Sequence, residues 1–140
     1  VYQLKKDFPH LTIVLNGGIT TLDDCEAHLS HVDGVMLGRE PYQNPWLLAG
    51  VDAQLFGDQA HDLSRYEVAL ALMPYLETVL SRGGRANHVL RHVLGLYQRQ
   101  PGGKLFRRLL SEGMHKAEAD AALFKEAVDA TEALIARRSA

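Results

Sequence analysis

The amino-acid sequence predicts an α/β segment followed by an all-α segment. Two short apolar runs, residues 11–15 and 34–38, each lead into a glycine turn and enclose a helical pattern, which is the layout of a βαβ unit. From residue 64 onwards strand patterns are absent, and apolar residues recur at helical spacing. We therefore expect two domains, residues 1–60 and residues 61–140.

Composition limits the class of protein. The 140 residues carry a formal net charge of −2, with 46% hydrophobic and 23% charged residues, which is typical of a globular protein and not of a disordered tail, a fibre or a coiled coil. The longest apolar runs are far shorter than the roughly 20 residues of a membrane-spanning helix, and we expect no signal peptide. A single cysteine excludes a disulfide framework and a four-cysteine zinc site. We expect a cytoplasmic protein without membrane contact.

Three successive patterns predict the start of the first domain. Residues 11–15 are apolar on both faces and rich in β-branched side chains, which favours a strand buried in a parallel sheet. Thr21 and Asp24 have the spacing of a capping box, so a helix is expected over residues 22–31. Residues 34–38 predict the second strand. Asparagine followed by proline at 44–45 then predicts the start of a further helix, with asparagine as its cap.

The second domain is predicted as a bundle of about four helices. Residues 50–63 are expected to be a linker, and Ser64 with Glu67 forms another capping-box pattern that begins a helix running to about residue 80. Pro74 is expected to bend this helix. The remaining helices are expected over residues 87–97, 104–110 and 116–137.

The two strand ends predict a phosphate site. Asn16, Gly17 and Gly18 follow the first strand, and Gly38 and Arg39 follow the second. Carboxyl ends of parallel strands bind ligands, glycine lets backbone N–H groups approach an anion, and arginine presents a planar charged fork to phosphate oxygens. The alternative is a pair of turn glycines with a surface arginine. Many (β/α)8 barrels build a phosphate site after their seventh and eighth strands.

A complete barrel needs about 250 residues, and only two barrel strands are visible here. We expect the C-terminal portion of a (β/α)8 TIM barrel followed by a helical bundle domain, or else a small α/β unit of another kind.

A strongly basic window lies in the second domain. Residues 81–110 contain seven basic residues and no acidic residue, whereas residues 1–80 contain 4 basic and 11 acidic residues. Such a window attracts phosphate or nucleic acid, and the alternative is a solvated basic face or pairing with the acidic flanks. The basic residues are Arg82, Arg85, Arg91, Arg99, Lys104, Arg107 and Arg108.

Longer segments extend these patterns. They are NGGI (16–19), DGVMLGRE (33–40), YQNP (42–45), NHV (87–89), RH (91–92), GLY (95–97), QPG (100–102), RR (107–108) and LS (110–111). Together they resemble the tRNA-dihydrouridine synthases, in particular the A subfamily, over nearly the whole chain. The resemblance implies a flavoprotein that reduces the C5–C6 bond of uridine in the tRNA D-loop, at U20 and U20a, with NADPH recharging FMN. It also implies an FMN-binding barrel followed by a helical tRNA-binding domain, in an enzyme that is monomeric.

The resemblance assigns cofactor residues but no catalytic residue. Asn16, Gly17, Gly18, Gly38 and Arg39 would contact FMN near its phosphate. The family's proton donor is a cysteine in the first half of the barrel, which this chain does not contain, so the chain alone is expected to be inactive. The cysteine at position 25 falls on the apolar face of a predicted helix, and we expect it to be packed as a small apolar residue.

The RNA contacts are expected in the basic window, at Arg91, His92, Lys104, Arg107 and Arg108, with Lys104 chosen on charge alone. The rival hypotheses are a non-catalytic helical RNA-binding module and a different phosphate-binding TIM-barrel enzyme. A metal site is not expected: the histidines at 88 and 92 have zinc-ligand spacing, but no nearby cysteine or acid completes a set of ligands.

Overall fold

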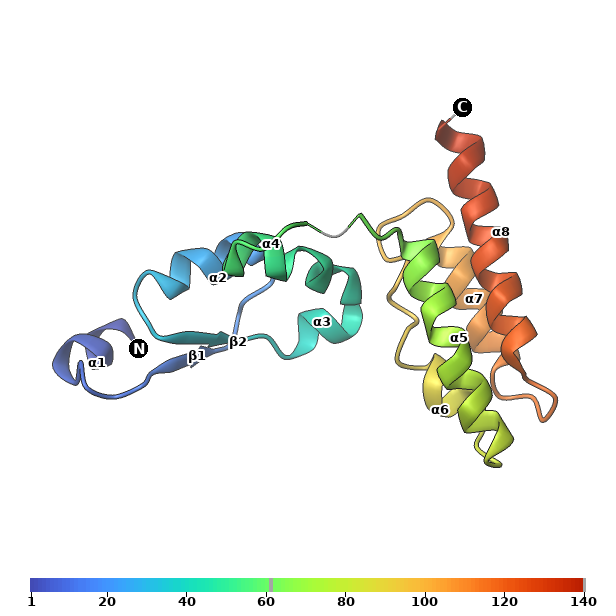
Figure 1. Cartoon of the computed structure of the whole chain (residues 1–140), viewed down its shortest axis with the longest axis horizontal. Coiled ribbons are helices and arrows are strands. Elements are labelled where there is room, and N and C mark those ends of the chain that lie inside the picture. Colours follow the sequence, from blue (N-terminus) through green and yellow to red (C-terminus); the bar gives the residue numbers. More distant parts are fainter. Residues whose placement is uncertain (61, 140) are drawn as a thin grey trace. The chain divides into compact units, whose positions relative to one another are not determined.

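The structure is a computed structural model that describes residues 1–60 and 62–139 (Figure 1). The chain divides into two compact units, Val1–His61 and Asp62–Ala140. His61, where the second domain was expected to begin, and Ala140, where it was expected to end, lie outside the described residues. The fold is mostly helical with one small parallel sheet. Among the described residues, every helix is too short or too polar to cross a membrane.

A short βαβ unit forms the centre of the N-terminal unit. Strands β1 (Val14–Asn16) and β2 (Gly34–Met36) pair in parallel, with Val14 opposite Gly34. Helix α2 (Leu22–Leu29) connects them. Both predicted strands are therefore confirmed, although each has only three residues in the ladder and the apolar runs that predicted them are longer.

The two predicted capping boxes are confirmed. The Asp24 N–H donates to the Thr21 hydroxyl and the Thr21 N–H donates to the Asp24 carboxylate, both at 3.0 Å. In the C-terminal unit, the same reciprocal bonds join Ser64 and Glu67 at the start of α5 (Arg65–Ser81), at 3.2 and 2.7 Å. Each box satisfies backbone donors that have no partner inside the helix, which explains why both helices begin where the sequence predicts.

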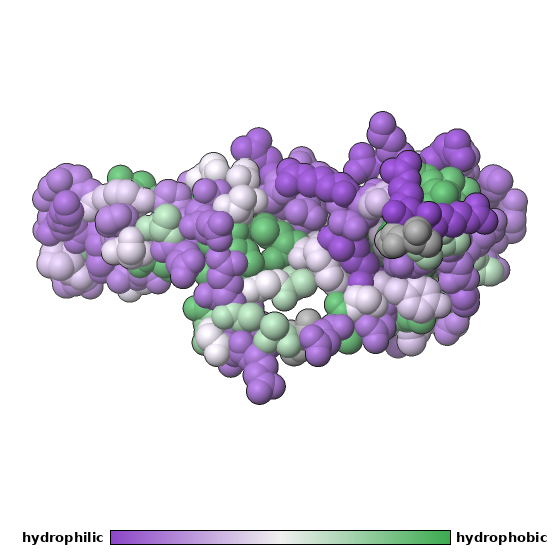
Figure 2. Space-filling model, turned by 90° about the horizontal axis from the view of Figure 1, so that it is seen from above, coloured by the Kyte–Doolittle hydropathy of each residue, from purple (hydrophilic) through white to green (hydrophobic). Residues whose placement is uncertain are grey.

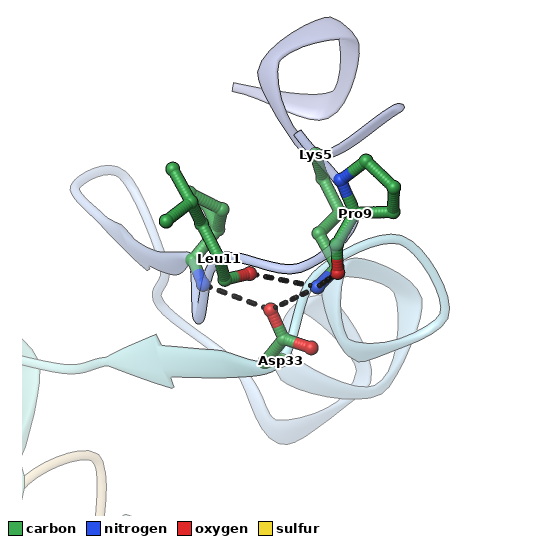
Figure 3. Close-up of polar contacts among 5 residues, drawn as sticks. Lys5, Pro9, Leu11 and Asp33 are labelled. Carbon is green, nitrogen blue, oxygen red and sulfur yellow. Dashed lines mark hydrogen bonds and ion pairs between the residues drawn. The ribbon is translucent and has the colours of Figure 1, made fainter. Parts of the chain in front are cut away.

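Helix α1 (Tyr2–Asp7) is not predicted by the sequence, because it has six residues and no side-chain cap. Tertiary contacts hold it instead. The Lys5 ammonium lies 2.8 Å from the Asp33 carboxylate and donates to the carbonyl oxygens of Pro9 and Leu11 at 3.0 and 2.9 Å (Figure 3). A helix this short is unstable alone, so the ion pair with Asp33, the residue before β2, and the bonds to the chain that follows the helix explain its presence.

The Asp33 carboxylate also makes the N-terminal unit sensitive to acid. It accepts a hydrogen bond from the Ile13 N–H at 2.8 Å, and this bond, together with Lys5, holds the pKa of Asp33 below its ordinary value of 3.8. A group whose pKa is lowered by folding stabilises the fold above its unfolded pKa, and this stabilisation is lost as the pH falls through the folded pKa. We expect the free energy of unfolding to fall below about pH 4. Urea denaturation between neutral and acidic pH measures this dependence.

Asp33→Asn should reduce that acid dependence, and the remainder comes from Asp24, whose pKa the capping box also lowers. Asp58→Asn, at an exposed carboxylate, serves as the matched control and should retain the full dependence. Equal acid dependence in the Asp33→Asn protein and the unsubstituted protein would contradict the assignment.

The segment after β2 differs from the prediction. Helix α3 (Arg39–Gln43) is not predicted, and the helix expected at Pro45 is the 3-10 helix η1 (Pro45–Gly50). The predicted cap at Asn44 is wrong: its side chain makes no capping hydrogen bond, because this residue already ends α3, with φ −135° and ψ 72°. Proline at the first position of η1 is confirmed.

The predicted linker at 50–63 is also partly wrong, since α4 (Val51–Phe56) occupies its first half. Val51 and Leu55 lie four residues apart and pack against the core of the unit, and Gly57 ends the helix in the left-handed conformation. Of the residues that indicated a linker, Gly57 caps this helix, whereas Asp58 and Asp62 lie after it.

The core of the N-terminal unit lies between the sheet and the helices α2 and α4, which pack side by side (Figure 1). Ile19, Leu22 and Cys25 are its buried centre. The expectation that Cys25 is packed as a small apolar residue is confirmed. Partly buried residues surround this centre: Leu15, Val35, Leu37, Leu47, Val51 and Leu55.

The C-terminal unit is all helical in the residues described. Helices α7 (Gly103–Gly113) and α8 (Ala121–Ser139) pack closely, and α5 packs against α8 (Figure 1). Its core contains three aromatic rings, from Tyr97, Phe106 and Phe124, with centroids 4.9 Å apart for the first pair and 6.3 Å for the second. All three side chains are fully buried.

Two helix predictions in this unit need correction. The helix expected over 87–97 is only α6 (Asn87–Leu90), and the chain then continues in i→i+3 turns to Gln100, with Gly95 weakening the helix and Arg99 at φ 62°. The last helix does not begin at 116: the Asp120 carboxylate accepts two backbone N–H groups at 3.0 and 3.2 Å and thereby starts α8 at 121.

Candidate functional site

All five residues expected to hold a phosphate line one pocket of the N-terminal unit, with a volume of about 370 Å³. Asn16, Gly17 and Gly18 come from the end of β1, and Gly38 and Arg39 from the end of β2. The parallel pairing of Asn16 with Met36 places both strand ends at one edge of the sheet. The remaining lining residues are Ile19, Thr20, Met36, Glu40 and Gln43.

The glycine turn leaves the backbone open to this pocket. Gly17 and Gly18 adopt φ +119° and +74°, and a Cβ added at either would meet nothing within 4 Å. Residues with a side chain rarely adopt these φ values, so the turn itself needs glycine. The space beside it stays free for a ligand. Successive backbone N–H groups in such turns form concave anion sites.

The chemistry of the lining suits a phosphate. Arg39 begins α3 with an exposed side chain, and its guanidinium can give two parallel hydrogen bonds to phosphate oxygens. One lining residue of opposite charge, Glu40, follows directly in the first turn of α3. The hydroxyl of Thr20 already donates to the Asp24 carboxylate at 3.2 Å, which fixes the far side of the turn.

A second pocket lies on the C-terminal unit, beside α7, with a volume of about 490 Å³. Lys104, Arg107, Arg108 and Ser111 line it from one exposed face of the helix, at positions i, i+3, i+4 and i+7. The opposite face buries Phe106, Leu110 and Gly113 in the core. Burial of the apolar face therefore orients the predicted RNA-binding side chains of α7 toward solvent.

Sequence reasoning missed the other wall of this pocket. Gln98, Arg99 and Gln100 line it from the turn before α7. Arg99 lies in the basic window, but its left-handed backbone has no sequence signal, because φ 62° is rare for any residue except glycine, asparagine and aspartate. The structure brings Arg99 together with Lys104.

Arg91 and His92 are not brought into this pocket. They follow α6, and the Arg91 guanidinium Nε donates to His92 Nε2 at 3.0 Å. Because α6 ends at Leu90, His88 and His92 do not share a helix. Within residues 1–60 and 62–139, no group of three or more His, Cys, Asp or Glu side chains is placed to hold a metal ion.

Cys25 is not positioned for catalysis. Its side chain is fully buried in the core, and burial raises the pKa of the thiol, with the neighbouring Asp24 carboxylate raising it further. A buried neutral thiol is a poor nucleophile and a poor proton donor to a bound substrate.

Hydrogen bonds of Tyr97 and its neighbour Leu96 hold one wall of the second pocket in place. The Tyr97 hydroxyl donates to the Glu132 carboxylate at 2.6 Å, and burial, followed by this hydrogen bond, raises the pKa of Tyr97. The Arg65 guanidinium Nε donates to the Leu96 carbonyl at 3.1 Å. These bonds tie α5 and α8 to the turn that carries Arg99.

Comparison with known proteins gives a family match over most of the chain. A family model described as "Dihydrouridine synthase (Dus)" matches residues 1–134. Curated relatives named tRNA-dihydrouridine(20/20a) synthase are 52% identical over 128 residues in Salmonella typhi and 57% identical over 127 residues in Pseudomonas aeruginosa. Each alignment covers 91% of this chain but 39% and 38% of the relative. The chain thus spans about two fifths of the length of these relatives.

Proposed function

The chain belongs to the dihydrouridine synthase family, and on that premise we propose that it is the C-terminal part of a flavin-dependent tRNA-dihydrouridine synthase. The observation that carries the proposal is the identity of 52% and 57% to two tRNA-dihydrouridine(20/20a) synthases across 91% of the chain. The proposed reaction is reduction of uridines 20 and 20a of tRNA to dihydrouridine, with NADPH as reductant.

The first pocket is proposed to hold the phosphate of FMN. Asn16, Gly17 and Gly18 would offer backbone and amide donors, and Gly38 would leave room for Arg39 to reach the phosphate oxygens. Bound FMN, once reduced by NADPH, would supply the hydride for uridine reduction. This chain's own contribution is to hold and orient that cofactor at the edge of its sheet.

The N-terminal unit is proposed to be the last two strands of a TIM barrel. Its sheet contains only β1 and β2, so each strand has one edge without a neighbouring strand among the described residues. Val14 and Met36 belong to these strands yet are 55% and 47% exposed. Hydrophobic side chains reach the surface over this unit (Figure 2). Further strands and their helices would cover these edges and side chains.

The C-terminal unit is proposed to bind tRNA through Arg91, His92, Lys104, Arg107 and Arg108. The support is the acid-free basic window and the exposure of these side chains. The chain alone is proposed to be inactive, since its one cysteine is buried away from both pockets and the proton donor would come from the first half of the barrel. We propose a cytoplasmic, monomeric whole enzyme.

The native protein from its source cells tests this proposal. We expect an intact mass well above 15.5 kDa, bound flavin in the absorption spectrum, and NADPH-dependent dihydrouridine at positions 20 and 20a of tRNA. A native mass of 15.5 kDa without flavin would overturn the enzyme and favour a non-catalytic RNA-binding module.

Arg39→Gln in the native-length enzyme is expected to lower the flavin content of the purified protein about tenfold, because a charge-assisted hydrogen bond to phosphate is lost. The flavin-to-protein absorbance ratio measures this. Arg82→Gln removes the same charge outside the pocket and is the matched control. Full flavin content in the Arg39→Gln enzyme would remove this residue from the cofactor site.

A further inference from the structure

The pocket beside α7 has two walls that differ in character. One wall is the face of a regular helix, carrying Lys104, Arg107 and Arg108. The other is the irregular turn that carries Arg99 between two glutamines. The turn is anchored, because Tyr97 next to it is fully buried and hydrogen-bonded to Glu132.

The charge of the pocket has one sign. Four of its lining side chains are cations, none is a carboxylate, and the neutral ones include Ser111 and the amides of Gln98 and Gln100. All four cationic side chains are exposed. Cations gathered in a concave site without a compensating acid repel one another, and a bound anion relieves this repulsion. The neutral hydroxyl and amides can donate further hydrogen bonds to anionic oxygens.

Arg99 adds an independent observation. It is the only non-glycine residue with positive φ in the part of the chain that the structure describes, at 62°. Strained residues persist where the surroundings determine them, and they gather at ligand sites. Glycine or asparagine would fit this backbone without strain, so the presence of arginine indicates a use for its guanidinium.

We propose that this pocket seats a backbone phosphodiester of RNA, with Arg99 contacting the phosphate opposite the basic face of α7. The inference rests on the proposed function, since tRNA is the proposed partner, and it deepens that function by placing one RNA phosphate between two defined walls. It also separates Arg99, Lys104, Arg107 and Arg108 from Arg91, which lies outside the pocket.

The test is tRNA binding by the full 140-residue chain over a series of salt concentrations. Arg99→Gly removes the guanidinium and also relieves the backbone strain. We expect its thermal midpoint to be no lower than that of the unsubstituted chain, its tRNA affinity to fall roughly tenfold, and its slope of log affinity against log salt to fall by about 0.7 to 0.9. Loss of affinity without loss of stability cannot come from misfolding.

Two further variants sharpen the test. Arg99→Lys keeps the positive charge but loses the planar guanidinium. It should therefore keep most of the slope of log affinity against log salt that Arg99→Gly loses. Arg137→Gln is the matched control, because this exposed arginine in the last turn of α8 lies outside both the basic window and the pocket. It should bind tRNA as the unsubstituted chain does.

The remaining outcomes overturn the inference in distinguishable ways. The unsubstituted chain could bind tRNA more tightly than a variant with neutral residues at 104, 107 and 108, but no more tightly than Arg99→Gly. In that case the proposed phosphate seat between the two walls is wrong, but the proposed RNA binding by α7 survives. If the unsubstituted chain does not bind tRNA, both fail. If polyglutamate displaces tRNA as well as an RNA of equal charge does, the pocket recognises acidic protein segments and the RNA assignment fails.

Discussion

Phe106→Ala is expected to lower the free energy of unfolding of the C-terminal unit by about 3 to 5 kcal/mol. Phe106 is fully buried, with its ring 4.9 Å from the ring of Tyr97 and 6.3 Å from the ring of Phe124. Removing it loses the transfer free energy of the ring and leaves a cavity between two aromatic side chains that are themselves held in place. Thermal and urea unfolding followed by circular dichroism measure the loss.

The matched control in the same unit is Tyr75→Ala, where the side chain is 59% exposed and the expected change is within about 0.5 kcal/mol. Because a loss of several kcal/mol is comparable with the whole stability of a small domain, Phe106→Ala can leave the unit unfolded. Phe106→Leu keeps most of the volume, and we expect a loss of about 1 kcal/mol. Equal midpoints for the Tyr75 and Phe106 alanine variants would show that Phe106 does not hold this core together.

The parts of the fold that the sequence predicts correctly are those specified by local chemistry. The capping boxes at Thr21 and Ser64 consist of residues three apart, so their pattern is readable before any tertiary contact is known. The two strands are likewise predicted by short apolar runs that end in glycine turns, the first of them rich in β-branched residues. The lining of the first pocket, where a phosphate is expected, follows from these strands, because parallel pairing brings their carboxyl ends to one edge.

The sequence mispredicts secondary structure at positions where contacts with residues distant in the chain determine the backbone conformation. Helix α1 is stabilised by the contact of Lys5 with Asp33, 28 positions further along the chain. No local sequence pattern near Lys5 predicts this helix. The helix expected over 87–97 stops at Leu90, and the buried Tyr97 with its bond to Glu132 holds the later turns instead. In the sequence, Arg99 is one more charge of the basic window, since composition cannot show that its backbone is left-handed.

Gly103→Ala is expected to destabilise the C-terminal unit by about 2 to 3 kcal/mol, although alanine is normally the better helix residue. A Cβ at Gly103 would lie 2.2 Å from the carbonyl oxygen of Tyr97 and 3.1 Å from its carbonyl carbon. The obstacle is backbone, so no side chain can move aside, and α7 must shift away from the turn. Gly83→Ala is the control for backbone strain alone: it has φ +78° and nothing within 4 Å, and about 1 kcal/mol is expected.

The same substitution separates geometry from charge in RNA binding. Tyr97 and Gly103 both line the pocket beside α7, so a shift between them changes the distance from Arg99 to Lys104 without removing either cation. At a temperature where Gly103→Ala remains folded, we expect tRNA affinity to fall several-fold while the slope of log affinity against log salt stays unchanged, because that slope counts neutralised phosphates. Arg99→Gly should lower both. If Gly103→Ala is destabilised yet binds tRNA with full affinity, the two walls do not act together, and the cations of α7 bind RNA as an open surface.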